Sequence, residues 1–294
     1  MKFLFSLLPL LLLACVGWAV NTMEQEFLCP ICGTHWEQRV ETSKQLRGMR
    51  LDLRQLGDVV DPPTLPQCTK CRFPLFSGRL VEQANDPAKA LAFKRLRAFV
   101  LGGDFQMLAS KNPSYFCLAQ VQELLGAPHR HIALSYLRAS WQVEDREAAC
   151  RRLLEKAREH FLAALAEMGE GERKRSDVTL LCGEMERRLG KWDEAEKRFR
   201  EVESSGVLRS TEQAVIPVMQ LRLIARKDSA PHPLDAADVA ARSPAKGDAA
   251  PDEKPMLHLE NPDRLKQPGD ALKIEQPPRP PAVPAVPAFD LPVK

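Results

Sequence analysis

Aromatic residues are scarce in this chain, and neither sign of charge dominates it. Phe, Trp and Tyr make up 6% of the 294 residues, whereas Ala, Leu, Glu and Arg are abundant in the middle of the chain, a composition that favours helices over sheets. The 42 basic and 39 acidic side chains give a formal net charge of +3, without the concentrated basic stripe of a nucleic-acid-binding surface. We therefore expect a mainly α-helical protein with no nucleic-acid partner.

The sequence also lacks the motifs of common active sites. It has no glycine-rich phosphate loop, no nucleophile–base signature and no metal motif that leaves a ligand position open. The histidines are scattered: His129 and His131 are two residues apart, so they point in different directions on a helix, and His160 is alone. These absences argue against an enzyme and against a small-molecule substrate.

The first twenty residues form a hydrophobic segment. Lys2 precedes an apolar run with no charge before Glu24, which is typical of a secretory signal peptide. Cleavage after Ala19, lipidation of Cys15 in a lipobox-like Leu12-Leu13-Ala14-Cys15, and retention as an anchor of about 18 apolar residues are all compatible with this run. Each alternative predicts export to the periplasm or cell envelope, and the last two predict contact with the membrane.

Two C-x-x-C pairs are separated by 35 residues: Cys29-Pro30-Ile31-Cys32-Gly33 and Cys68-Thr69-Lys70-Cys71. Two residues between cysteines allow a tight turn to direct both sulfurs at one point, so each pair supplies half of a tetrahedral metal site. The pairs predict a structural zinc site with four ligands, Cys29, Cys32, Cys68 and Cys71. Zinc would stabilise a module at residues 23–82 that otherwise lacks a core.

Other chemistry is open to these cysteines. An oxidising compartment favours disulfides, and C-x-x-C is also a motif of thiol–disulfide exchange. Thioredoxin-type catalysis places its motif at the start of a helix in a βαβ unit, a context that Cys29 and Cys68 lack. His35 could replace a ligand, but we interpret it as a surface histidine. Three further cysteines stand singly in helical stretches and are expected to be small buried side chains: Cys117, Cys150 and Cys182.

Helical periodicity begins after the second cysteine pair and defines an array at residues 86–227. Asp86-Pro87 is typical of an N-cap followed by proline at the first helical position, and Gly102-Gly103 is expected to end this helix. Its apolar face comprises Leu91, Phe93, Leu96, Phe99 and Val100. Further helices are predicted at 114–125, 129–142, 147–168, 176–189, 192–204 and 211–226. Short loops between them imply antiparallel neighbours.

Two segments of the array resemble tetratricopeptide (TPR) repeats. In one, a small residue allows close helix crossing, a glycine makes the turn, and an Ala-x-x-x-Phe pair packs the second helix on the first; these residues are Gly183, Gly190, Trp192, Ala195 and Phe199. Ala157-x-x-x-Phe161 repeats the pair 38 residues earlier, rather than the usual 34.

Helical periodicity ends after Lys227. Residues 228–294 hold 14 of the 24 prolines and cannot bury enough apolar surface to offset the entropy of ordering, which predicts a disordered tail. We interpret the tail as a spacer, with a docking peptide or cell-wall-spanning linker as the alternative.

Residues 27–226 as a whole resemble the uncharacterised bacterial domain-of-unknown-function family 2225, in which a Cys-Pro-x-Cys-Gly module and a second C-x-x-C precede TPR-like helices. Arg72 departs from the glycine expected in the second pair. The resemblance implies zinc binding and an interaction role, and it supplies no known reaction. The matching residues are Cys29, Pro30, Cys32, Gly33, Cys68, Cys71 and Tyr136-Leu137-x-Ala139-x-Trp141.

Together these patterns predict a mainly α protein: TPR-like antiparallel helical hairpins, preceded by a small zinc-ribbon-like module and followed by a disordered tail. The predicted function is that of an exported, envelope-associated scaffold whose helical array holds a protein partner in its concave face. The alternatives are an exported thiol–disulfide oxidoreductase that uses one C-x-x-C pair, and a structural tether of envelope layers.

Overall fold

A computed structural model of the protein describes residues 22–41, 45–58, 61–76, 89–169, 173–205 and 211–234. The predicted export segment with Cys15, the Asp86-Pro87 helix start and the tail beyond Leu234 lie outside these residues. Helices account for 58% of the described residues, which confirms the mainly α prediction. None of the described helices combines the length and hydropathy needed to cross a bilayer.

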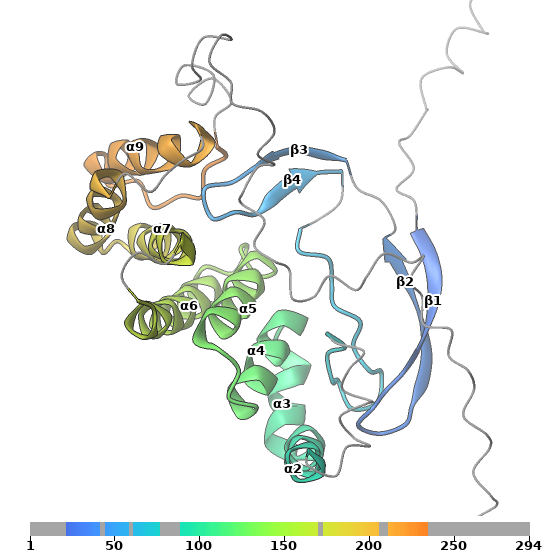
Figure 1. The fold of residues 1–294 in the computed structure, drawn as a ribbon. Coiled ribbons are helices and arrows are strands. Elements are labelled where there is room, and N and C mark those ends of the chain that lie inside the picture. Colours follow the sequence, from blue (N-terminus) through green and yellow to red (C-terminus); the bar gives the residue numbers. More distant parts are fainter. Residues whose placement is uncertain are drawn as a thin grey trace, which may run out of the picture.

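Two small antiparallel sheets precede the helices. In the first, β1 (Thr22–Leu28) pairs with β2 (His35–Glu41), and the rings of Phe27 and Trp36 stack at a centroid distance of 5.3 Å. In the second, β3 (Leu46–Met49) pairs with β4 (Gln55–Gly57). Both sheets lie on the same side of the helices (Figure 1).

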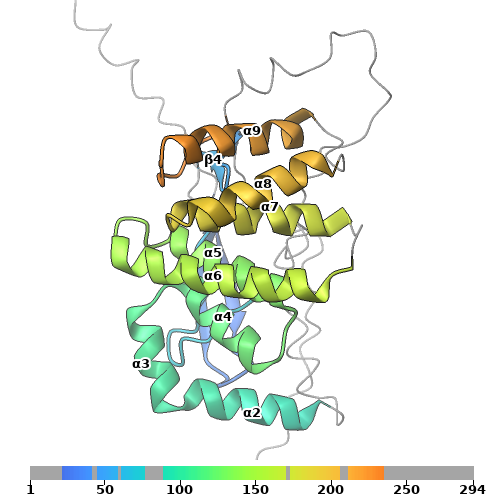
Figure 2. The ribbon, with the colours of Figure 1, turned by 90° about the vertical axis from the view of Figure 1, so that its left-hand side faces the viewer.

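The helices follow one another in a curved stack (Figures 1 and 2). Consecutive helices from α4 onward pack together, and short loops make hairpins of α5 with α6 and of α7 with α8. The bounds are α2 (Ala90–Leu101), α3 (Gly103–Lys111), α4 (Ser114–Leu124), α5 (His129–Trp141), α6 (Glu147–Glu167), α7 (Arg173–Arg188), α8 (Trp192–Ser204) and α9 (Thr211–Ala225).

The prediction that Gly102-Gly103 ends the first helical segment was only half right. Gly102 leaves α2 with an extended backbone, but Gly103 is the first residue of α3, which the sequence analysis missed. The apolar face expected on α2 is also narrower than predicted. Leu96 and Val100 are buried, whereas Leu91 is 62% exposed.

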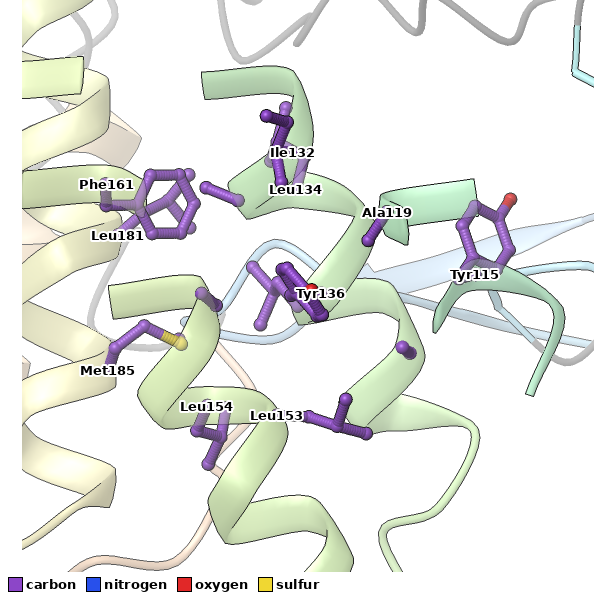
Figure 3. Close-up of a cluster of buried hydrophobic side chains, with 14 of the residues drawn as sticks. Tyr115, Ala119, Ile132, Leu134, Tyr136, Leu153, Leu154, Phe161, Leu181 and Met185 are labelled. Carbon is purple, nitrogen blue, oxygen red and sulfur yellow. The ribbon is translucent and has the colours of Figure 1, made fainter. Parts of the chain in front are cut away.

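A large cluster of buried side chains lies between α4, α5, α6 and α7 (Figure 3). The packing roles assigned from the TPR-like pattern are confirmed at both Ala-x-x-x-Phe pairs, because all four side chains are fully buried. Gly183 lets α7 and α8 approach closely, since a Cβ at this position would lie 2.8 Å from the Phe199 ring. Gly190 turns the chain with a φ of +74°, a conformation that favours glycine.

Buried charges attach the loop between β3 and β4 to the helices. Asp52, 1% exposed, accepts hydrogen bonds from Arg50, from Arg188 of α7 and from the Trp141 indole of α5. Glu144, in the α5–α6 loop, accepts from the same two arginines and from Arg54. The two carboxylates pair with three guanidinium groups, so that no charge is buried without a partner, which would be costly in free energy.

The chain after α9 differs from the prediction that the tail starts at Asp228. The amide of Leu234 donates to the Met49 carbonyl (2.7 Å), and the amide of Leu51 donates to the His232 carbonyl (3.0 Å). The carbonyls of Asp228 and Ala230 accept hydrogen bonds from the fully buried Arg187. Backbone pairing needs no hydrophobic pattern, so composition alone gave no sign of this docking.

Candidate metal centre

The first C-x-x-C pair lies in a tight turn directly after β1. The amide of Gly33 donates to the Cys29 carbonyl (2.9 Å), and the amide of Cys29 donates to the Thr34 carbonyl (2.9 Å). Gly33 has a φ of +71°. The glycine therefore provides the left-handed backbone that brings the chain back after the second cysteine.

The second pair repeats this turn. The amide of Arg72 donates to the Cys68 carbonyl (2.9 Å), and the amide of Cys68 donates to the Phe73 carbonyl (3.0 Å). Arg72, which stands where glycine was expected, has a φ of +58°. The two turns thus share one backbone geometry, although the second adopts it with a residue that disfavours a left-handed conformation.

The turns bring the sulfur atoms of all four predicted ligands together. These atoms lie within 4.8 Å of one another, with Cys29 Sγ 3.5 Å from Cys71 Sγ and Cys32 Sγ 3.4 Å from Cys68 Sγ. The four cysteines form no disulfide, and both separations are well beyond a sulfur–sulfur bond of about 2.05 Å. They are close to the about 3.8 Å edge of a tetrahedron with metal–sulfur distances of about 2.3 Å. The four thiols could therefore hold a metal ion.

The protonation of the cluster also favours a cation. A hydrogen bond from the Cys71 thiol lowers the pKa of Cys29 to about 5, and the same contact raises the pKa of Cys71. Without a cation, the negative charge of one thiolate therefore disfavours deprotonation of the neighbouring thiol. A metal ion among the sulfurs would remove this opposition, because coordination deprotonates thiols.

A family model described as "Uncharacterized protein conserved in bacteria (DUF2225)" matches residues 22–222, which include both C-x-x-C pairs and the helices into α9. The chain belongs to this family. No curated protein and no solved structure matches it. The family resemblance expected from the cysteine pattern is therefore confirmed, and it brings no established reaction.

In this DUF2225 protein the candidate site is buried and supported by the helices. Cys29, Cys68 and Cys71 are at most 3% exposed, and only Cys32 is half-buried. Their turns share an apolar cluster with α2, α3 and α4, including Leu96, Val100 and Phe105. Such surroundings exclude water, which suits a structural metal ion rather than one with an open position.

Two side chains from the helices hold the backbone of the turns. Arg97 of α2 donates to the Ile31 carbonyl (3.1 Å), and Gln106 of α3 donates to the Cys71 carbonyl (2.7 Å). The sequence analysis missed both residues, because it treated 23–82 and 86–227 as separate modules and did not predict α3. Their role follows only from the packing of α2 and α3 against the turns.

The other candidate side chains remain apart from the cluster. His35 is exposed on β2, as expected for a surface histidine. The three single cysteines are buried as predicted, with Cys117, Cys150 and Cys182 at most 7% exposed. Within the described part of the chain, only the four C-x-x-C cysteines form a group of three or more potential metal ligands.

The paired turns predict unequal losses of stability for two substitutions. Gly33→Ala should destabilise the metal-loaded protein by about 1–2 kcal/mol through the positive φ alone, since a Cβ there meets no atom within 4 Å. Arg72→Gly relieves the same strain at an exposed position but adds freedom to the unfolded chain, so it should change stability by less than about 1 kcal/mol. Denaturant unfolding of both variants measures the difference. Equal losses of unfolding free energy in the two variants would contradict the conclusion that both turns need a left-handed residue after the second cysteine.

Proposed function

We propose that this protein is an exported, envelope-associated scaffold in which a structural zinc ion holds the N-terminal segment against a helical array that binds a protein partner. The observation that carries the proposal is the closed set of four cysteine sulfurs, buried against α2, α3 and α4. Export, and contact with the membrane through residues 1–20 or a lipidated Cys15, are supported by the sequence of that segment.

Zinc is the metal that these ligands favour. Four thiolates at tetrahedral spacing suit zinc or an iron–sulfur centre, and zinc is the commoner ion where two C-x-x-C turns form a closed site. With every ligand from the protein, the ion has no position for substrate and contributes to folding instead. A segment with two small sheets has little core of its own and would depend on such an ion.

The alternative of a thiol–disulfide oxidoreductase has less support. A reactive thiol in such an enzyme is accessible and commonly lies at a helix N-terminus. Both pairs here lie in turns outside helices, and Cys29 is 1% exposed. The third possibility, a tether of envelope layers, depends on the proline-rich tail, which beyond Leu234 lies outside the described residues.

We infer that the partner contacts the α2–α4 end of the array. On the inner side of the stack, Arg50 and Arg54 are bound to the α5–α6 loop, which leaves less of that concave side free than the sequence suggested (Figure 1). Among the described residues, five of the eight large exposed apolar side chains are on α2, α3 and the end of α4, and the other three are on β1 and β3. The five are Leu91, Leu101, Met107, Leu124 and Leu125. Such side chains are a common feature of protein interfaces.

Metal analysis tests the zinc site. The full chain should retain one tightly bound zinc, and Cys68→Ser should lose it. Cys150→Ser is the matched control, because it also removes a buried thiol but one outside the cluster, and it should keep the zinc. Intact mass spectrometry under non-reducing conditions can contradict the proposal. If both cysteine pairs are oxidised and no metal is bound, the cysteines form disulfides or carry out redox chemistry, and the zinc site is wrong.

Cross-linking of the exported protein followed by capture tests the partner surface. The double variant Leu91→Glu/Met107→Glu should lose the captured partner, because charge on an apolar contact opposes desolvation. Arg152→Glu, at an exposed position on α6, should retain it. A chain that ends at Leu234 should also retain it. If that truncation alone abolishes capture, the tail is the recognition element and the array is not.

A further inference from the structure

The outward face of α2 carries apolar and basic side chains next to one another. Leu96 and Val100 are buried in the core, so the positions opposite them on the helix face the solvent. Residues three and four apart on a helix are neighbours, which places the exposed side chains of α2 in one stripe. The exposed residues of this stripe are Leu91, Lys94, Arg95, Ala98 and Leu101.

The short helix α3 repeats this mixture. Phe105 and Ala109 are buried, whereas Met107 and Lys111 are exposed on the other side of the helix. Met107 and Lys111 are four residues apart and are therefore neighbours on the helix surface. Together α2 and α3 form the end of the stack opposite to α9 (Figure 2). This end of the molecule thus combines large apolar side chains with positive charge.

The near balance of charge over the whole chain conceals a local excess at this end. From Lys89 to Lys111 the chain has five basic residues and one acidic residue, Asp104, which gives a net charge of +4, more than the +3 of all 294 residues. Within the described ranges, no carboxylate forms an ion pair with Lys94, Arg95 or Lys111. The positive charge of this end is therefore available to an acidic partner.

The two ends of the stack differ in how their apolar side chains are covered. Terminal helices of stacked arrays normally present a polar outer face. At the α9 end, the chain folds back after the helix, and Leu234 packs on the same apolar cluster as Met219 and Leu223 of α9. At the other end, the described part of the chain leaves Leu91 62% and Leu101 46% exposed. The outward face of α2 is thus a surface on which a further helix fits.

We propose that the protein partner supplies an acidic amphipathic helix, which stacks on the outward face of α2. The inference rests on the proposed function, in which a partner contacts this end of the array, and it adds the chemistry of that partner. Leu91 and Leu101 lie ten residues apart, about 15 Å along the helix axis, so a helix that contacts both needs about three turns. Between its apolar residues the partner helix carries carboxylates, which face Lys94 and Arg95.

Two other occupants fit this face less well. A second copy of the chain in a twofold dimer would place the same patch on both sides of the contact, so Lys94 and Arg95 would face their own counterparts and repel them. A helix that binds a membrane surface separates an apolar face, which enters the bilayer, from a charged face. In α2 the apolar face with Leu96 and Val100 is already buried in the core, and the outward face mixes apolar with basic side chains.

Photo-cross-linking in the producing cell tests the proposal, with a photoreactive phenylalanine analogue in place of Leu101 in the full-length protein. Mass spectrometry of the product should identify a partner helix with net negative charge. Lys94→Glu/Arg95→Glu should lower the yield about tenfold or more, because like charges across an interface repel each other. Arg151→Glu/Arg152→Glu makes the same charge change at adjacent exposed residues of α6 and should keep the yield.

A charge exchange gives the sharpest result: replacing the carboxylates of the identified helix by lysine should restore cross-linking to the Lys94→Glu/Arg95→Glu variant. Thermal unfolding of that variant should match the wild type, because both residues are exposed. Cross-links to phospholipid, to a second copy or to a segment without acidic residues would overturn the proposal. An undiminished yield in Lys94→Glu/Arg95→Glu, with loss in Leu91→Glu/Met107→Glu, would overturn the acidic helix but keep the proposed surface. No cross-linked product at all would contradict both.

Discussion

The four cysteine sulfurs can lie together only if two turns that are 35 residues apart in the sequence come into contact. The structure of the rest of the N-terminal segment depends on this constraint. Each turn provides its pair through the same hydrogen bonds and a left-handed residue. The apolar side chains beside the sulfurs then pack on α2, α3 and α4. A bound ion would therefore stabilise the sheets and also α2 and α3, which bury two residues each.

The N-terminal segment and the helices form one structure. Near α2 and α3 the contact is apolar, with Arg97 and Gln106 bound to backbone carbonyls of the turns. Near α5 and α7 it is ionic, through Asp52 and Glu144. Beyond α9 it is a backbone pairing with the residues up to Leu234. These attachments together span the stack, but only α2, α3 and α4 share an apolar cluster with the cysteines, so a change in the cysteine site should be transmitted to these first helices.

The sequence predicted most of the helices because helix-forming residues run between short breaks, several of which contain glycine or proline. The four candidate ligands were predictable for a similar reason, since C-x-x-C spacing is a local property. The missed features depend on tertiary contacts: α3 starts with glycine, and His160, which the sequence analysis treated as isolated, lies 2.8 Å from His129 (Nδ1 to Nδ1) because two helix ends meet. Docking of the chain after Asp228 depends on backbone hydrogen bonds, which no side-chain pattern records.

The central claim is that the metal site unites the N-terminal segment with the first helices. Hydrogen exchange of the full chain, measured by mass spectrometry before and after removal of the metal by a chelator, tests it directly. We predict that residues 22–76 and Ala90–Leu124 lose protection together, whereas α7 and α8, which pack away from the cysteine cluster, change little. Loss of protection confined to residues 22–76, or no loss at all, would contradict the account.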